Sequence, residues 1–480
     1  MPKCKKNDIM SIMKIELEKL EKSELIEIIL IQMAQVEALT KRVAELEAQL
    51  NQNSTNSSKP PSTDWKQGKI LRGSSGANPG GQPGHKGNFL KIEREADEIV
   101  NMKPSRCAKC GKELHGTEGS VKEQRNKIDV EIRTKITRYE QVEVECPCCN
   151  SINREEFPAE VKSHVSYGEG VQSIGVLLTS YANVSIGKTQ KIMNDVLEVP
   201  ISTGTLVNHT KEFAGKSKPI LKEIADCVKS GETANFDETS VRVNGKNYWM
   251  HTAGNSEATY NTVHESRGTA GTDDNGVLKE FKGVAVHDCL PQYFKYGNCT
   301  HAVCNAHLVR ELQGVIDNTG QVWAANMQTL LRDTKKSVDE HKTDGQIALP
   351  DNLLQSFASE YDRIIALGEI ESPRNPDTRK QSKSRNLLER FIEYRTEIIR
   401  FADNFDVPFT NNQAERDIRN AKIKVKVAGC FRSVDGAKNF GKISSVIGTA
   451  TKQSKSAFKT IGDIFNGSLV SIFRKPKLQQ

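Results

Sequence analysis

Long apolar runs are missing from this chain of 480 residues. A helix that crosses a bilayer needs about 20 consecutive apolar residues, and no run approaches that length. The first residues, MPKCKKNDIM, also lack the apolar stretch and the small-residue cleavage site of a secretory signal. The sequence therefore predicts no membrane association and a cytoplasmic location.

Disulfides are also unexpected, although the chain contains 11 cysteines. The cytoplasm is reducing, and cysteines that cluster in a protein of that compartment more often bind a metal. A chain of 480 residues is too long for one ordinary hydrophobic core. We therefore expect about two to four structural units.

Positive charge is concentrated at the C-terminal end. Residues 416–480 contain 14 Lys and Arg against three acidic residues, whereas the net charge of the whole chain is only +7. A segment this basic favours a polyanionic partner such as nucleic acid. A solvated charged surface is equally compatible with the charge alone.

Residues 1–51 are predicted to contain a coiled-coil helix. Between residues 15 and 51 the chain is rich in Glu, Leu, Lys and Ile and contains no Pro or Gly. Apolar residues recur every seven positions, with a second row that Gln32 interrupts; the two rows are Ile29, Val36, Val43 and Leu50, and Leu39 and Leu46. This pattern favours a partner helix and hence a homo-oligomer. A helix folded back on its own chain is the alternative.

Residues 52–100 abandon this periodicity. They are built largely from Asn, Ser, Pro, Gly and Lys, and such a composition cannot bury enough apolar surface to fold alone. We expect a basic flexible linker. Its composition is compatible with following a phosphate backbone and equally with being a passive tether.

Residues 101–155 contain two close groups of cysteines. They read Cys107-Ala-Lys-Cys110 and Cys146-Pro-Cys148-Cys149, and a β-like stretch, residues 127–145, separates them. Tetrahedral Zn²⁺ favours four soft ligands, and each turn of this kind presents two thiolates. We predict a structural zinc ribbon with Cys107, Cys110, Cys146 and Cys149 as ligands and Cys148 as an alternative to Cys149. A group of unliganded cysteines is the competing interpretation.

Residues 156–230 have a helical pattern. Two helices are predicted around a turn at Glu198-Val199-Pro200, with Ser202 as the N-cap of the second helix. A helix-turn-helix places its second helix in the major groove, and polar groups on that helix would come from Thr205, Asn208, His209 and Lys211. A small helical bundle that bridges two domains is the alternative.

Residues from 232 onward predict a mixed α/β sheet. Three β-rich runs with an Asn244-Gly245 turn are typical of an antiparallel meander. A helix-like stretch, DNGVLKEF, follows, and then come the strand VAVHD, the strand HAVCN and the helix AHLVRELQGVI. Strands joined by crossover helices after a meander indicate a mixed sheet.

Two acids of this region are candidate metal ligands. Asp237 lies within the first strand and Asp288 ends the fourth. If those strands are neighbours, both carboxylates reach one point, where oxygen ligands hold Mg²⁺ or Mn²⁺ well. A third carboxylate would complete a two-metal site for phosphodiester chemistry. Periodicity does not select it among the nearby acids Glu238, Asp273, Asp274, Glu280 and Glu311.

The order of motifs along the chain resembles the insertion sequence 66 family of transposases. The motifs are NSSKPPSTD, GGQPGHKG, the paired cysteines, FDETSVRV, VHDCLPQY, CNAHLVREL and NNQAERDIR, and they cover nearly the whole chain. The resemblance implies a multidomain α+β protein with an RNase H-like catalytic domain at residues 231–470 and an α-helical insertion at about 308–405. It also implies a DDE triad, which here is Asp237, Asp288 before Tyr293, and Glu415 in NNQAER.

The same resemblance implies a function. A DNA transposase of this kind binds the ends of its element, cleaves them with Mg²⁺ (or Mn²⁺) and joins the 3′-hydroxyl ends to target DNA. Double-stranded DNA is then a partner, accessory proteins of the element are candidates, and the protein would be associated with the nucleoid. Arg416 and Arg419 lie one and four residues beyond Glu415, where either could meet a phosphate. Lys422, Lys424, Lys426 and Arg432 would also face DNA.

The sequence also predicts how the helix that carries Glu415 begins and where Cys304 and His307 lie. Asn412 is predicted to N-cap a helix with Glu415 at the third position, which makes a capping box. Cys304 and His307 are expected to be packed in the interior rather than to bind a metal. The competing functions are a non-catalytic DNA-binding scaffold or regulator and, ranked last, a plain RNase H-type nuclease.

Overall fold

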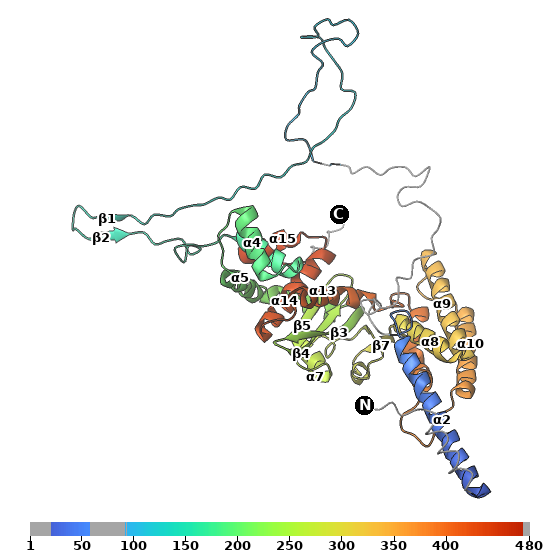
Figure 1. The fold of residues 1–480 in the computed structure, drawn as a ribbon. Coiled ribbons are helices and arrows are strands. Elements are labelled where there is room, and N and C mark those ends of the chain that lie inside the picture. The colour runs from blue at the N-terminus through green and yellow to red at the C-terminus, as the bar shows by residue number, and fades with distance from the viewer. Residues whose placement is uncertain (1–20, 58–91, 93, 474–480) are drawn as a thin grey trace, which may run out of the picture. The chain divides into compact units, whose positions relative to one another are not determined.

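The computed structural model of the chain describes residues 21–57, 92 and 94–473 (Figure 1). The start of the predicted coiled-coil segment and most of the predicted linker lie outside these residues. The chain divides into one unit of Met1–Gly68, Glu160–Gln190 and Ile201–Gln480, and a second unit of Lys69–Ala159 and Lys191–Pro200. None of the helices in the described part combines the length and the apolarity that a membrane crossing requires.

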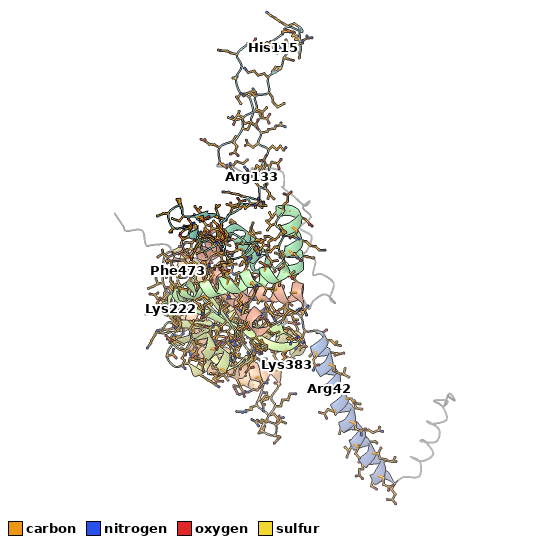
Figure 2. All side chains as sticks on the ribbon, turned by 90° about the vertical axis from the view of Figure 1, so that its left-hand side faces the viewer. Arg42, His115, Arg133, Lys222, Lys383 and Phe473 are labelled. Carbon is orange, nitrogen blue, oxygen red and sulfur yellow. The ribbon has the colours of Figure 1, made fainter. Side chains whose placement is uncertain are left out.

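Residues 94–159, which contain the two groups of cysteines, have little regular structure. Strands β1 (Glu143–Glu145) and β2 (Ile152–Arg154) pair antiparallel. The prediction of β-structure is wrong for residues 127–142, which carry no strand. Apolar side chains there are exposed, 76% for Val130 and 89% for Ile136. Figure 2 shows the side chains around His115 and Arg133 standing out from the backbone. Without a pairing strand and a buried face, this stretch has nothing that stabilises a sheet.

The predicted helix in the N-terminal segment is present as α2 (Lys22–Leu50). Its heptad residues lie on the surface, with Ile29 56% and Leu50 79% exposed. Figure 2 shows the side chains of α2 along the helix near Arg42. Apolar side chains in such a row are covered only when another helix packs against them.

A helical group precedes the sheet. It consists of α3 (Glu169–Val176), the π-helical turn η2 (Leu177–Tyr181), α4 (Ile186–Leu197), α5 (Thr203–Lys216) and α6 (Lys218–Lys229). The predicted N-cap is confirmed, because the hydroxyl of Ser202 accepts a hydrogen bond from the backbone N–H of Thr205 at 3.0 Å. His209 of α5 is only 6% exposed and packs edge-on against Tyr167, so its ring is not available to a ligand at the surface.

The central sheet has five strands in the order β5-β4-β3-β6-β7. Strands β3 (Thr233–Val243), β4 (Lys246–Gly254) and β5 (Thr259–His264) form the predicted antiparallel meander, and β6 (Val284–His287) and β7 (Thr300–Val303) continue the sheet in parallel. Asn244 and Gly245 both have positive φ, 46° and 79°, which a two-residue hairpin turn requires. The mixed sheet is therefore confirmed.

Two helices pack on the same face of this sheet. Helix α13 (Asn412–Ala428) packs on β3 and β4, and α14 (Val434–Lys452) packs on β5 (Figure 1). Alternate residues of β3 point to opposite faces, so Val241 meets Ile418 of α13 while Phe236 packs against Phe281 on the other side. Helix α15 (Ala457–Phe465) packs beside α3.

The predicted helix over DNGVLKEF is wrong. The helix in this region, α7 (Thr269–Asn275), ends where that stretch begins. Gly276 ends it in the left-handed conformation, with φ of 74°, and its N–H bonds back to the carbonyl of Thr272. A left-handed residue at this position stops a helix. The apolar residues that follow, Val277 and Phe281 among them, are buried, but the segment that carries them is not helical.

Helices between β7 and α13 form a layer with its own core. They are α8 (Asn305–Thr319), α9 (Val322–Thr343), α10 (Asp351–Glu371), α11 (Lys383–Glu393) and α12 (Arg395–Asp403). Trp323, Tyr361 and Phe391 are fully buried between them. The segment after α2 docks on this layer, because the amide of Asn56 donates to Asp317 of α8 at 2.9 Å.

Candidate active site

Asp237 lies within β3, and Asp288 directly follows the end of the neighbouring strand β6. The register pairs Asn235 of β3 with Val286 of β6, and Asp288 directly follows the last residue of β6. Parallel neighbours keep their register along the sheet. The chain therefore carries Asp237 and Asp288 to the same point, where β6 ends and β3 continues.

Glu415 comes to the same face of the sheet on α13. It lies in the first turn of that helix, which packs against β3. Asn411, 2% exposed, fixes this first turn. Its side-chain amide donates to the carbonyl of Phe236 at 2.7 Å and accepts from the amide of Asn235 at 2.8 Å. The two residues before Asp237 on β3 thus hold the start of the helix that carries Glu415.

The predicted capping box at Asn412 is wrong. Asn412 is the first helical residue, and the N-cap is Asn411, which makes no side-chain cap hydrogen bond. The reason is that the amide of Asn411 is already bound to β3. The backbone N–H of Glu415 bonds instead to the carbonyl of Asn411 at 3.2 Å. The carboxylate of Glu415 is therefore not held by a capping box.

Burial and neighbouring charges raise the pKa of Asp237 and Asp288. Burial raises the pKa of Asp237 well above its usual range, and the charges of Glu238, Asp288 and Glu415 raise it further. Burial and the charge of Glu238 also raise the pKa of Asp288. Clustered carboxylates that repel one another in a partly buried site are the environment that a divalent cation stabilises. Asp237, Asp288 and Glu415 nevertheless do not form a group whose ligand atoms all lie within 4.8 Å of one another.

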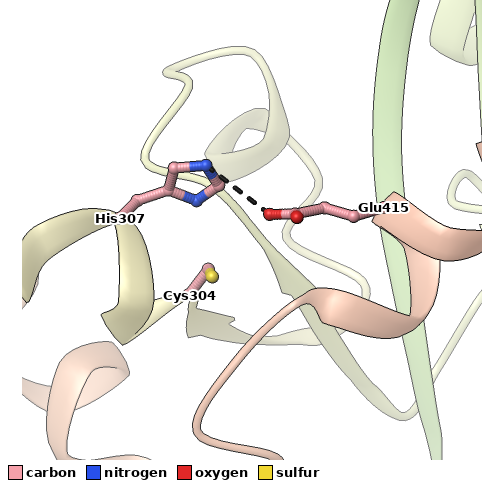
Figure 3. Close-up of side chains that lie close together, drawn as sticks. All are labelled: Cys304, His307 and Glu415. Carbon is pink, nitrogen blue, oxygen red and sulfur yellow. Dashed lines mark ion pairs between the residues drawn. The ribbon is translucent and has the colours of Figure 1, made fainter. Parts of the chain in front are cut away.

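Glu415 does form such a group with Cys304 and His307. In the part of the chain that the structure describes, these three alone bring one ligand atom each within 4.8 Å of the others. Figure 3 shows His307 at the start of α8 facing Glu415 of α13, with Cys304 beside them. The His307 Nε2 atom lies 3.7 Å from the nearer Glu415 oxygen. This cluster could hold a metal ion, and it places the ring of His307 and a carboxylate side by side.

The interior packing expected for Cys304 is present together with that cluster. Cys304 is fully buried, and its sulfur accepts the backbone N–H of Asn411 at 3.1 Å. Burial raises the pKa of its thiol to about 11, so the neutral thiol is favoured. Burial also lowers the pKa of His307, which favours the neutral ring. Arg310 approaches the same oxygen of Glu415 at 4.0 Å.

Glu238 points to the other face of β3. Its side chain is 1% exposed, and one oxygen accepts from Arg267 Nε at 2.8 Å. The other oxygen accepts from the hydroxyl of Tyr293 at 2.5 Å. Both oxygens are thus bound within the protein, which separates Glu238 from the acids that remain open to a ligand.

The predicted DNA-binding residues fall into two groups. Arg419, Lys422 and Lys426 follow Glu415 at helical spacing on one exposed face of α13, and Arg416 is exposed beside them. Arg432 is exposed at the rim of a hollow that Lys246 and Tyr248 also line.

Lys424 lies on the opposite side of α13. Its ammonium donates to the carbonyl of Thr179 at 2.6 Å and to that of Val184 at 3.4 Å. Burial lowers the pKa of Lys424. This lysine connects α13 to the helical group instead of facing outward with the other cations.

The predicted zinc ligands come together in pairs. Hydrogen bonds from the backbone and the side chain of Cys110 lower the pKa of Cys107. Contacts with Ser151 and with the Cys146 side chain lower the pKa of Cys149. Cys107 therefore interacts with Cys110, and Cys149 interacts with the side chain of Cys146. The two pairs do not meet in one group of ligands.

Sequence reasoning missed two features of this site. Nothing in the spacing of NNQAER shows that its first Asn binds β3, because the contact depends on the tertiary fold. Arg267 was not singled out either, although the alternation along β3 could have placed Glu238 opposite Asp237 and so indicated a separate partner for it.

The fold and the site define a mixed α/β protein with carboxylates grouped where β6 ends beside β3. A family model described as "Transposase IS66 family" matches residues 166–439, which is more than half of the chain. The chain therefore belongs to this family of transposases, and its members' function implies a DNA-processing enzyme that binds DNA. A family of unknown function (DUF6444) matches residues 7–91. No curated protein matches the chain.

Proposed function

We propose that this transposase is a DDE enzyme that cleaves the ends of its element and joins the 3′-hydroxyl ends to target DNA. Asp237, Asp288 and Glu415 are the proposed ligands of Mg²⁺ or Mn²⁺ in an RNase H-like domain at residues 231–470. The observation that carries this proposal is that Asp288 follows β6 beside Asp237 of β3, and that α13, which carries Glu415, packs on β3. Burial raises the pKa of Asp237, and the charges of Asp288 and Glu415 add to this shift. The acids come from distant parts of the chain, so a role limited to local structure does not account for them.

The carboxylates at this point fit hard divalent cations. Carboxylate oxygens are the ligands that Mg²⁺ and Mn²⁺ prefer. A metal pair there would activate water or a 3′-hydroxyl and stabilise the leaving oxygen. Glu415 would turn from His307 toward Asp237 when a metal binds, and Asn411 fixes the start of its helix to β3.

His307 and Arg310 hold Glu415 from the side of the helical insertion. Both lie on α8, directly after β7, and both approach the same carboxylate oxygen. We infer that they position this carboxylate and that Arg310 contributes positive charge next to the reacting phosphate. In this arrangement the insertion at about 308–405 connects to the site through its first turn.

The exposed face of α13 is the proposed path of the DNA strand. Arg419, Lys422 and Lys426 form a row of cations that starts at Glu415. Lys422 also donates to the carbonyl of Ser240 at 3.2 Å, which brings its charge close to Asp237. Phosphate contacts of this kind orient a duplex without reading its sequence. Arg416 and Arg432 are proposed to extend the same basic surface. Lys424 is not part of it, because its ammonium donates to the carbonyl of Thr179.

The remaining parts are proposed to bind DNA ends and to assemble protomers. The exposed heptad row of α2 fits a coiled-coil partner helix from a second copy. The paired cysteines at residues 101–155 are proposed zinc ligands, and four thiolates would organise a segment that buries few apolar residues. The linker at 52–100 joins these parts. The helices around residue 199 are the proposed helix-turn-helix of the 156–230 region, where Asn208 and Lys211 are exposed.

Cleavage of a labelled duplex that carries the element's end tests the proposal. We expect wild-type protein to cut the duplex only with Mg²⁺ or Mn²⁺. The variants Asp237→Asn, Asp288→Asn and Glu415→Gln should lose at least about 1,000-fold in rate, because each removes a metal ligand, while binding to the duplex is kept. Asp377→Asn, an exposed acid of the insertion, is the matched control and should cut normally.

Two outcomes would contradict the proposal. Normal cleavage by Asp237→Asn would remove that residue from the triad. Wild-type protein that binds the duplex but never cuts it, under conditions in which a second transposase is active, would favour the DNA-binding scaffold instead.

A further inference from the structure

Arg267 has an unusual setting for a surface arginine. It lies between β5 and α7, and its side chain is 48% exposed. Its Nε donates to Glu238 at 2.8 Å, and its guanidinium carbon lies 5.0 Å from the centre of the Trp249 ring. An arginine held at one edge by a carboxylate and on one face by an aromatic ring has little freedom to turn.

The two residues that hold Arg267, Glu238 and Trp249, are themselves fixed in place. Glu238 is buried and also accepts the hydroxyl of Tyr293. Tyr293 is 2% exposed and stacks on His287, with 4.7 Å between the ring centres. Trp249 lies on the neighbouring strand β4 beside Ser240, two residues from Glu238, and so on the same face of the sheet.

This arrangement leaves the outer edge of the guanidinium open. Nε is directed inward, and the two terminal amino groups have no hydrogen-bond partner among residues 21–57, 92 and 94–473. Two parallel N–H donors at that edge match two oxygens of a phosphate. Arg395 of the insertion is held in a similar way, because its Nε donates to Asp362 and its guanidinium lies over the ring of Tyr361. One of its terminal nitrogens, however, also donates to Asp362, at 3.0 Å.

The open edge lies close to the acids of the site. Tyr293 belongs to the segment that follows Asp288, and the same Glu238 that binds Tyr293 binds Arg267. β6 ends at His287, so the segment that carries Asp288 borders both faces of the sheet at this point.

We propose that Arg267 binds a backbone phosphate of the DNA next to the cleaved bond, and that Glu238 and Trp249 hold its guanidinium in the orientation for that contact. This inference rests on the proposed function, because it needs DNA at the acid cluster. Arg267 would approach the DNA from the segment between β5 and α7, and Lys422 would approach it from α13, so the two cations would reach the cut site from different elements. Glu238 is then a positioning residue and not a metal ligand.

The salt dependence of DNA binding tests this contact. Each phosphate contact contributes about 0.9 to the slope of log Kobs against log salt concentration. The probe is a fluorescent duplex of the element's end, titrated with the full chain in EDTA at several NaCl concentrations. The double variant Glu238→Gln/Arg267→Gln avoids an unpaired buried carboxylate. We expect its slope to be smaller by about 0.9 than that of the wild type.

Two further variants separate the contact from a purely structural role. Arg395→Gln, the matched control, should keep the wild-type slope. Arg267→Lys keeps the positive charge but lacks the two parallel N–H donors of the guanidinium. We therefore expect a salt-dependence slope within about 0.3 of the wild type. The cleavage rate should be lower by about tenfold. Circular dichroism and the melting temperature establish that each variant is folded before its slope is compared.

The outcomes distinguish this inference from the proposed function. A folded double variant with the wild-type slope and affinity overturns the role of Arg267, even if the wild type cuts DNA normally. A wild type that neither binds nor cuts the duplex contradicts the proposed function itself. Loss of cleavage in Arg267→Lys together with an unchanged rate in the double variant would also contradict the inference.

Discussion

The side chain of Asn411 fixes the helix of Glu415 to the strand of Asp237. Replacing it in Asn411→Ala removes two hydrogen bonds and leaves the carbonyl of Phe236 and the amide of Asn235 without this partner in a buried place. An unsatisfied buried polar group costs about 1 to 3 kcal/mol. The free energy of unfolding should therefore fall by on the order of 3 kcal/mol.

Urea unfolding followed by tryptophan fluorescence measures this change. With a slope of about 3 kcal/mol per M, the midpoint should shift down by about 1 M. Asn412→Ala is the matched control, because Asn412 is exposed and makes no cap. Its unfolding free energy should stay within about 0.5 kcal/mol of the wild type.

The same variant should also lose activity. A displacement of about 1 Å at a catalytic group can lower the rate by about 100-fold, and Asn411→Ala frees the turn that carries Glu415. An Asn411→Ala protein with wild-type stability, or an Asn412→Ala protein that is the more damaged of the two, would refute the reasoning. The second result would restore the capping box that the sequence predicted.

Three other predictions follow from the described contacts. Because burial and neighbouring acids raise the folded pKa of Asp237, its contribution to stability is present below the unfolded pKa and is lost as pH rises through the folded pKa. In EDTA, Asp237→Asn should therefore melt above the wild type at pH 8, with little difference at pH 3; a constant difference would contradict this. Lys452 and Asp417 form a largely buried ion pair at 2.6 Å, so Asp417→Ala should lower the free energy of unfolding in urea by about 3 kcal/mol. A decrease below about 1 kcal/mol would contradict this. Cys149→Ser should lower the zinc content per chain and Cys148→Ser should not; equal effects would contradict the pairing.

Local sequence signals predicted the sheet well. The alternation of apolar residues and the Asn244-Gly245 pair act within a few residues, so the meander and its turn could be located without tertiary information. The strand that ends at Asp288 was found for the same reason. The strand order, with β6 beside β3, was only assumed, and it required the structure.

The predictions that failed depended on competition between local and tertiary effects. DNGVLKEF contains good helix formers, but Gly276 at its third position adopts a left-handed conformation that ends α7 there. Residues 127–142 alternate like a strand, yet they have no partner strand in the described structure. Asn412 has a capping pattern, but the helix begins there because Asn411 binds β3.

The candidate site could be predicted only in part. Asp237 within the first strand and Asp288 at the end of the fourth were singled out on the condition that those strands are neighbours. Glu415 came from the family resemblance alone, because no periodicity links a helix so far along the chain to β3. The position of Arg267 depends on the register between β3 and β4 and on the path of the segment that carries Tyr293. Neither is encoded in a short motif.

Binding of Mn²⁺, followed by electron paramagnetic resonance, tests the central claim most directly. We predict that the wild type binds Mn²⁺ and that Asp237→Asn, Asp288→Asn and Glu415→Gln each weaken this binding by at least about tenfold. Cys304→Ser should leave it unchanged, because a thiol is a poor ligand for Mn²⁺. Binding that is lost in Cys304→Ser and Glu415→Gln but kept in both aspartate variants would assign the ion to the Cys304–His307–Glu415 cluster and contradict the proposed triad.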